Sequence, residues 1–135
     1  MALLEVKDLE VYYGVICALK GISFDVNEGE IVTLIGANGA GKTTTMQSVI
    51  GLIPSRAGTV TFNGTDITKT PCHKIVHLGM TQVPEGRRVF QELTVYENLL
   101  MGAYSNKNNA TFKDDLERIY TQFPRLAERK SQIAG

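Results

Sequence analysis

The fold of this protein is decided by the stretch Ile31-Val32-Thr33-Leu34-Ile35-Gly36-Ala37-Asn38-Gly39-Ala40-Gly41-Lys42-Thr43. Its first five residues are nearly all apolar, which is typical of a strand that is buried on both faces of a parallel sheet. Gly36 interrupts this run, and residues 42–51 then have a composition that suits a helix. A buried strand, a glycine-rich loop and a helix in this order predict an α/β fold.

The loop, residues 36–43, matches the pattern G-x-x-x-x-G-K-[ST], the Walker A phosphate loop. Glycines adopt backbone angles that other residues disfavour, so successive N–H groups can converge on phosphate oxygens. The helix that begins near Lys42 adds the positive end of its dipole. Lys42 would place its charge on the β- and γ-phosphates, and the Thr43 hydroxyl is the expected ligand of Mg²⁺. The sequence therefore predicts a site for a nucleoside triphosphate.

The residues expected to bind the phosphates are Gly36, Asn38, Gly39, Ala40, Gly41, Lys42, Thr43 and Thr44. Thr44 is the least defined of them, because its hydroxyl could meet the α-phosphate or face solvent. A glycine-rich turn that matches the motif by chance is the alternative, but the strand before the loop and the helix after it argue against chance.

Length and composition exclude several classes of function. The chain has 135 residues, 43% hydrophobic and 21% charged, and its formal net charge is zero. This balance gives no electrostatic reason to expect nucleic acid as a partner. No apolar run approaches the roughly 20 residues of a membrane span, and the N-terminus lacks the features of a secretory signal. Two cysteines are too few for a disulfide scaffold and favour a reduced, cytoplasmic compartment.

Local patterns predict the remaining elements. Alternation and β-branched residues indicate strands, Asn63-Gly64 favours a hairpin turn, and Thr94 with Glu97 fits a helix capping box. We expect strands at residues 3–13, 22–27, 31–35, 59–62, 65–67 and 79–83, and helices at residues 42–51, 71–78, 94–102, 112–122 and from Pro124 to the C-terminus.

Several segments resemble the opening part of an ABC-type ATP-binding subunit. They are Val11-Tyr12-Tyr13-Gly14, Ala18-Leu19-Lys20-Gly21-Ile22-Ser23-Phe24, the phosphate loop with the strand before it, and Ser55-Arg56-Ala57-Gly58-Thr59-Val60. The segments Val83-Pro84-Glu85-Gly86-Arg87-Arg88-Val89-Phe90 and Leu93-Thr94-Val95-Tyr96-Glu97-Asn98-Leu99 resemble the branched-chain amino-acid importer subfamily more closely. The resemblance covers the whole chain.

This resemblance implies a P-loop NTPase core of the ABC type, with an N-terminal antiparallel β subdomain and the start of a helical subdomain. Residues 1–135 would form a truncated, partial ATP-binding domain. Residues 1–85 would hold the β subdomain and the P-loop core, and residues 86–135 the Q-loop exit and the beginning of the helical subdomain. The implied cofactors are ATP and Mg²⁺. The implied partners are transmembrane permease subunits and a second ATP-binding subunit, at the inner face of the cell membrane.

The resemblance also assigns roles to individual residues. Tyr13 matches the aromatic residue that stacks on adenine, and Tyr12 is the competing candidate. Glu85 matches the Q-loop position, where most of the family has Gln. Its carboxylate could bind Mg²⁺ directly, through a water, or not at all. Gln82 is the alternative if the register of the match is shifted.

At the level of the family, the implied activity is ATP hydrolysis coupled to amino-acid transport. The signature, the second nucleotide motif with its catalytic Glu, and the switch histidine would all follow residue 135, so no catalytic residue is expected within this chain. One alternative is a truncated nucleotide-binding remnant or fragment without hydrolytic activity. Another is an unrelated P-loop enzyme such as a small kinase, but the sequence offers neither acceptor-binding residues nor a lid.

Overall fold

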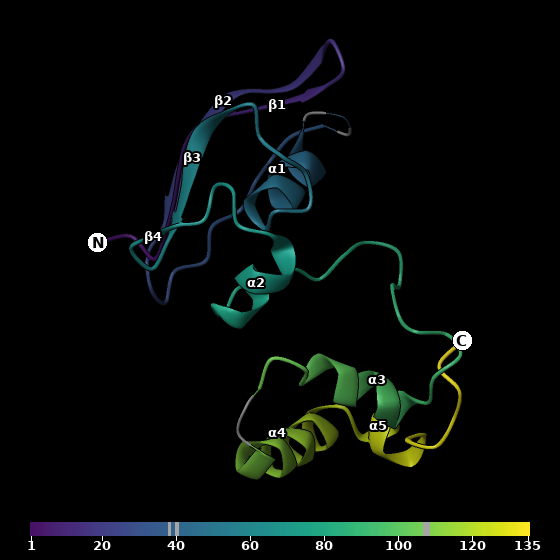
Figure 1. Cartoon of the computed structure of the whole chain (residues 1–135). Helices are drawn as coiled ribbons and strands as arrows, with labels where there is room; N and C mark the ends of the chain where they lie inside the picture. The colour runs from purple at the N-terminus through teal and green to yellow at the C-terminus, as the bar shows by residue number, and fades with distance from the viewer. Residues whose placement is uncertain (38, 40, 107–108) are drawn as a thin grey trace. The chain divides into compact units, whose positions relative to one another are not determined.

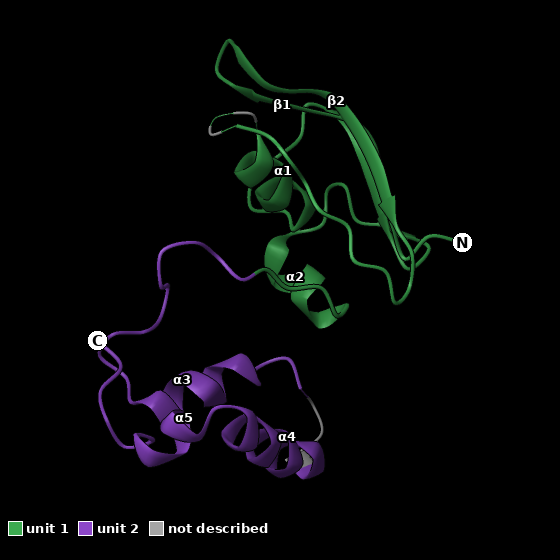
Figure 2. Ribbon diagram, turned by 180° about the vertical axis from the view of Figure 1, so that it is seen from behind, with its two compact units in different colours: residues 1–82 green, residues 83–135 purple. Residues whose placement is uncertain are grey.

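The computed structural model describes residues 1–37, 39, 41–106 and 109–135 (Figure 1). The described residues form two compact units, Met1–Gln82 and Val83–Gly135 (Figure 2). The boundary lies slightly before the division expected after Glu85. Within the described part of the chain, no helix has the length and apolar character that crossing a membrane requires.

The first unit is built on an antiparallel sheet with the strand order β2-β1-β3-β4. The strands are β1 (Leu4–Tyr13), β2 (Ile16–Val26), β3 (Ala57–Phe62) and β4 (Thr65–Asp66). The expected strands near residues 3–13, 59–62 and 65–67 are confirmed, and β2 starts well before the expected residue 22. Asn63 and Gly64 have φ angles of 48° and 79°, as a type I′ turn requires at both central positions.

Two helices, α1 (Lys42–Val49) and α2 (Cys72–His77), pack on one face of this sheet (Figure 1). Each helix supplies an apolar side chain to the core, Val49 from α1 and Ile75 from α2. The buried hydrophobic residues of the core are Val6, Leu9, Val11, Leu19, Val49, Val60, Ile67 and Ile75. The sheet and its two helices therefore share one apolar interior, against which α1 is fixed.

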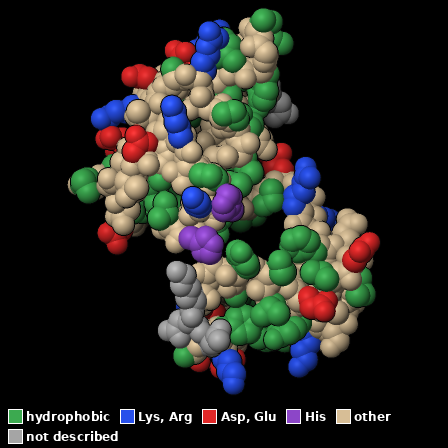
Figure 3. Space-filling view, viewed as in Figure 1, with side chains coloured by type: hydrophobic (Ala, Val, Ile, Leu, Met, Phe, Trp, Pro, Cys, Tyr) green, Lys and Arg blue, Asp and Glu red, His purple; other side chains and the backbone are tan. Residues whose placement is uncertain are grey.

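Two expected strands, residues 31–35 and 79–83, are not formed. Ile31 and Ile35 are 92% and 93% exposed, and Val83 is 93% exposed. A strand is stabilised by its pairing and by the surfaces that cover it, more than by the propensity of its residues. No other segment of the described chain pairs with either run. Large hydrophobic side chains remain on the surface of both units (Figure 3).

The second unit contains α3 (Val95–Gly102), α4 (Asn109–Gln122) and α5 (Pro124–Glu128). The capping box is confirmed, because the Glu97 N–H donates to Thr94 Oγ1 at 3.1 Å and the Thr94 N–H donates to Glu97 Oε2 at 2.8 Å. The Asn98 side chain secures the preceding loop by accepting from the Phe90 N–H at 2.8 Å and donating to the Phe90 carbonyl at 3.0 Å.

The prediction that the last helix reaches the C-terminus is wrong. α5 ends at Glu128, and the chain then folds back so that Ile133 pairs with Thr94 in an isolated antiparallel bridge. The Ala134 N–H donates to the Leu93 carbonyl at 2.9 Å. Backbone hydrogen bonds to the segment before α3 therefore replace those that a longer helix would have made.

Replacing Ile31 and Ile35 together by Thr should leave the free energy of unfolding of the first unit nearly unchanged, because both side chains are more than nine-tenths exposed. The change should reduce self-association, since it removes apolar surface from water. Ile75→Thr, at a fully buried position, is the control and should cost about 2 kcal/mol or more. Chemical denaturation and sedimentation measure both effects. Equal destabilisation by the two changes would mean that residues 31–35 are packed in solution.

Candidate functional site

The glycine-rich loop leads directly into α1, which begins at Lys42. Gly39 and Gly41 have φ angles of 86° and 94°, in the left-handed region that favours glycine. Asn38 and Ala40, which were expected to contact phosphate, lie outside the described residues. Gly41 is the N-cap of α1, so in the described structure no side chain satisfies the first N–H groups of the helix. Such N–H groups, at the positive end of the helix dipole, are well suited to bind an anion.

The Lys42 side chain folds back over the loop. Its ammonium group donates a hydrogen bond to the carbonyl oxygen of Gly36, at the start of the loop. This contact closes the loop on itself and keeps the positive charge beside the glycine backbone. An anion bound at the loop could therefore replace the Gly36 carbonyl oxygen as the partner of the ammonium group with little movement of the Lys42 side chain.

Three consecutive threonines in the first turn of α1 have different environments. Thr43 is exposed, and Thr44 is half-buried. Thr45 is 1% exposed, and its Oγ1 donates to the Gly41 carbonyl at 2.7 Å. Thr45 thereby fixes the end of the loop to the buried face of the helix. The phosphate-loop motif does not predict a role for Thr45, although the place of Thr45 on the inner face of an expected helix could have indicated one.

Tyr13 lies at the end of β1 with 49% of its surface exposed. Its hydroxyl is 3.3 Å from Thr44 Oγ1, and either group can donate the hydrogen bond. Tyr12 has other partners. The Arg56 guanidinium lies over its ring, 4.4 Å from the ring centre, and hydrogen bonding with Cys17 is the main cause that raises the pKa of Tyr12. Of the two aromatic candidates, Tyr13 is the one in contact with the helix of the loop.

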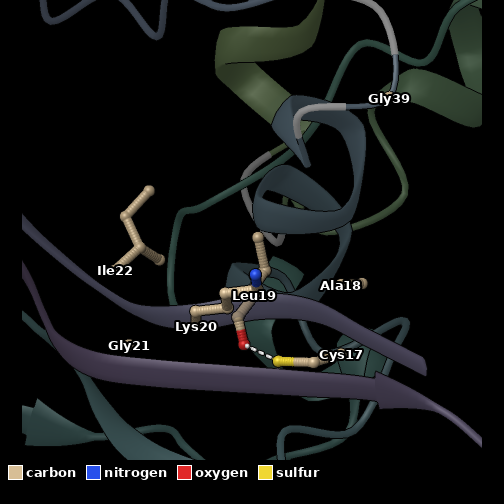
Figure 4. Close-up of a pocket in the computed structure, with 7 residues that line it drawn as sticks. All are labelled: Cys17, Ala18, Leu19, Lys20, Gly21, Ile22 and Gly39. Carbon is tan, nitrogen blue, oxygen red and sulfur yellow. Dashed lines mark hydrogen bonds between the residues drawn. The ribbon is translucent and has the colours of Figure 1, made fainter. Parts of the chain in front are cut away.

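Strand β2 packs against the glycine loop. A hollow of about 500 Å³ is lined by Cys17, Ala18, Leu19, Lys20, Gly21, Ile22 and Gly39 (Figure 4). Gly41 approaches the same strand so closely that a Cβ atom there would lie 2.6 Å from Leu19 Cδ2 and 3.2 Å from the Ala18 carbonyl oxygen. The packing of Gly41 on Leu19 therefore sets the position of the loop.

Glu85, the other expected site residue, belongs to the second unit and is exposed. Its carbonyl oxygen accepts a hydrogen bond from Arg88 Nε at 3.3 Å. Gln82, the alternative, is the last residue of the first unit. The structure thus brings together the loop, Thr44 and Tyr13 within the first unit. Among the described residues, no group of three or more His, Cys, Asp and Glu side chains could hold a metal ion.

A glycine loop, a lysine folded over it and a helix that starts from it define the P-loop class of fold. More specifically, the chain belongs to the ABC transporter family, whose model matches residues 19–134. The fold class and the resemblance predicted from the sequence are thereby confirmed.

Individual relatives support the same assignment. The high-affinity branched-chain amino acid transport ATP-binding protein BraG of Pseudomonas aeruginosa is 42% identical over 98% of this chain and 57% of BraG. The lipopolysaccharide export system ATP-binding protein LptB of Escherichia coli K12 is 40% identical over 74% of this chain and 42% of LptB. This chain thus spans about half the length of these two relatives.

Solved structures of the same family have similar backbones. One ATP-binding subunit of an ABC transporter superposes with a TM-score of 0.85 and 35% identity, over 97% of this chain and 54% of the other. The ADP conformation of an ATP-binding cassette superposes with a TM-score of 0.75 and 28% identity, over 100% of this chain and 58% of the other.

Replacing Gly41 by Ala should destabilise the first unit more than replacing Gly39. Both positions have a left-handed φ, so each change adds about 1–2 kcal/mol of backbone strain. A Cβ at residue 41 would also collide with Leu19, whereas a Cβ at residue 39 meets none of the described atoms within 4 Å. Chemical denaturation of the two variants measures the difference. Equal losses would contradict the packing of the loop on β2.

Proposed function

We propose that this chain is the nucleotide-binding part of an ATP-binding, energy-coupling subunit of an ABC importer for branched-chain amino acids. The observation that carries the proposal is the position of the Lys42 ammonium group, which is hydrogen-bonded to the Gly36 carbonyl oxygen. It lies over a loop whose glycines 39 and 41 have left-handed φ angles, at the start of α1, where no side chain caps the helix. Membership of the family and the likeness to BraG support the transport role. The proposed class of substrate is taken from the likeness to BraG, and import is proposed from the resemblance of residues 83–99 to the branched-chain amino-acid importer subfamily.

The triphosphate would be held by the backbone of the loop and by the first residues of α1. The proposed phosphate contacts are the backbone N–H groups of Gly36, Asn38, Gly39, Ala40 and Gly41 and the side chains of Lys42 and Thr43. On binding, the Lys42 ammonium group would exchange the Gly36 carbonyl for oxygens of the β- and γ-phosphates. A point charge at the positive end of a helix suits this role, because phosphate oxygens carry the opposite charge.

Mg²⁺ fits the same end of the helix. The Thr43 side chain is exposed next to Lys42, and a hydroxyl oxygen is the kind of ligand that Mg²⁺ takes together with phosphates and waters. When bound, the ion would neutralise part of the phosphate charge. Glu85 is proposed as a possible further ligand of the ion, directly or through a water, with Gln82 as the alternative.

Adenine is proposed to stack on Tyr13. The ring is half exposed and its hydroxyl lies at the first turn of α1, beside the proposed phosphate site. Stacking of a base on an aromatic side chain is worth about 1–3 kcal/mol in nucleic-acid complexes. Tyr12 is less suited to this role because Arg56 already covers its ring.

The proposed partners are transmembrane permease subunits and a second ATP-binding subunit, with the assembly at the cytoplasmic side of the cell membrane. We further propose that residues 1–135 alone bind nucleotide without steady turnover. Hydrolysis needs a base or water-positioning group as well as phosphate contacts. In the part of the chain that the structure describes, the side-chain hydrogen bonds at the loop involve Lys42, Thr44, Thr45 and Tyr13 and include no carboxylate.

Lys42→Ala should abolish or severely weaken the binding of Mg-ATP, because it removes the charge that faces the phosphates. Isothermal titration of both proteins measures the change. Lys69→Ala is the matched control, since Lys69 is exposed after β4 and lies outside the proposed site. Unchanged affinity of the Lys42 variant would overturn the assignment of the phosphate site.

The purified 135-residue chain should show no steady ATP hydrolysis above the background rate. The proposed reason is that no carboxylate is hydrogen-bonded at the described part of the loop to act as a base, so the chain should still bind ATP in the same preparation. The measurement is the release of phosphate over many turnovers by the unmodified chain and by the Lys42→Ala variant. Turnover that persists through purification and disappears in the variant would contradict the proposal.

A further inference from the structure

The end of the β1–β2 hairpin extends beyond the rest of the sheet (Figure 1). In the described part of the chain, the pairing of β1 with β3 ends at Glu10, which lies opposite Ala57. Val11 and Leu19 are the last buried residues of the two strands, and residues 12–18 are half-buried or exposed. A two-stranded ribbon without a core of its own is marginally stable in water. The contacts made by residues 12–18 therefore decide how firmly this hairpin end is held.

Arg56 extends the support of β3 beyond the point where the strand pairing ends. It immediately precedes β3, and its backbone N–H donates to the Glu10 carbonyl oxygen at 2.7 Å. Its guanidinium lies over the ring of Tyr12, two positions further along β1, at 4.4 Å from the ring centre. A cation in this position is attracted to the face of the ring. The contact thus attaches the hairpin end to the start of β3.

The Tyr12 side chain continues this attachment to β2. Tyr12 lies opposite Cys17 in the strand pairing, and hydrogen bonding between their side chains is the main cause that raises the pKa of Tyr12. The Cys17 thiol donates to the Leu19 carbonyl oxygen at 3.2 Å. The side chains of Arg56, Tyr12 and Cys17, which we call the hairpin clamp, therefore join the start of β3 to both strands of the hairpin end.

Tyr13, on which adenine is proposed to stack, directly follows the clamp residue Tyr12 and is the last residue of β1. Its side chain is 49% exposed, so little packing of its own holds the ring. The position of the ring therefore depends on the position of the hairpin end. An aromatic ring that is already in place loses less conformational freedom when a ligand binds.

We infer that Arg56 is a positioning residue for the base of the nucleotide, which acts through Tyr12 and the hairpin end without touching the ligand. The inference rests on the proposed function, because it requires adenine on Tyr13. Without the clamp, Tyr13 would occupy its place for a smaller fraction of the time, and the apparent affinity for the nucleotide would fall by that fraction. The phosphate loop packs on the buried Leu19 and should not be affected.

The test measures the binding of two probes to the full chain at one Mg²⁺ concentration: ATP, and inorganic tripolyphosphate, which has no base. Arg56→Gln removes the cation and keeps a polar side chain at this exposed position. It should weaken ATP binding by about two- to fivefold, the range of one exposed cation–π contact, and leave tripolyphosphate binding unchanged. Arg56→Lys keeps a cation and should restore most of the ATP affinity.

Two double variants show whether the effect passes through the clamp and through Tyr13. Adding Arg56→Gln to Tyr12→Leu should cause no further loss of ATP affinity, because the ring under the guanidinium is already gone. Adding Arg56→Gln to Tyr13→Ala should also cause no further loss, because the base contact is already gone. If Tyr12→Leu does not fold, the comparison with Tyr13→Ala still decides the question.

The matched control is Lys7→Gln, which removes a positive charge from β1 where Lys7 lies opposite Thr59 of β3. It should leave the affinities for both probes unchanged. Amide hydrogen exchange of residues 12–17 should become faster in Arg56→Gln and stay the same in Lys7→Gln. Thermal unfolding of each variant confirms that it is folded.

Equal weakening of ATP and tripolyphosphate binding in Arg56→Gln would overturn the inference, because it would reflect lost charge and not the position of the ring. An unchanged ATP affinity, or a full further loss when Arg56→Gln is added to Tyr13→Ala, would overturn it as well. Failure of the proposed function itself gives different results. In that case the unmodified chain would bind neither probe, or Tyr13→Ala would bind ATP as tightly as the unmodified chain does.

Discussion

The close packing of Gly41 against Leu19 is the constraint on which the rest of the site depends. Gly41 has φ 94°, and the space for a Cβ atom is already filled by the Leu19 side chain. Glycine suits this point because it adopts the left-handed φ and leaves room for the Leu19 side chain and the Ala18 carbonyl oxygen. The start of the helix is thereby pressed against β2, and the Lys42 ammonium group reaches back to Gly36. A buried Thr45, bonded to the Gly41 carbonyl, holds the arrangement from the side of the core.

The same packing relates the two ends of the proposed nucleotide site. β1 and β2 form one hairpin, so the strand that supports Gly41 is paired with the strand that carries Tyr13. The hydrogen bond between the Tyr13 hydroxyl and Thr44 Oγ1 joins β1 to α1 as well. The helix is thus attached to both strands of the hairpin. The proposed phosphate and base sites both lie in one local unit, Met1–Gln82, whose core is apolar and continuous.

Elements that depend on local sequence signals were predicted correctly. The turn at Asn63-Gly64 and the capping box at Thr94 and Glu97 depend on a few adjacent residues, and the structure forms both. The strands predicted at residues 31–35 and 79–83 are not formed, because a strand exists only when another segment pairs with it. The chain reversal after Glu128, where Ile133 pairs with the distant Thr94, was not predicted either.

The candidate site shows the same division between local and long-range information. The motif identified the loop, because its glycines and Lys42 act through their own backbone and charge. The support of Gly41 by Leu19 and the bond between Tyr13 and Thr44 join residues far apart in the sequence. Neither could be predicted from composition or spacing. The structure was needed to distinguish Tyr13 from Tyr12 by their different partners.

The most direct test of the account is a titration of the isotope-labelled chain with Mg-ATP, followed by the amide resonances of each residue. The account predicts that the largest changes fall on the glycine loop and the first turn of α1, residues 36–44, with a second group at Tyr13 and its neighbours. The amide resonances of β4 should not change. Changes spread evenly over the first unit, or centred away from the loop, would contradict it.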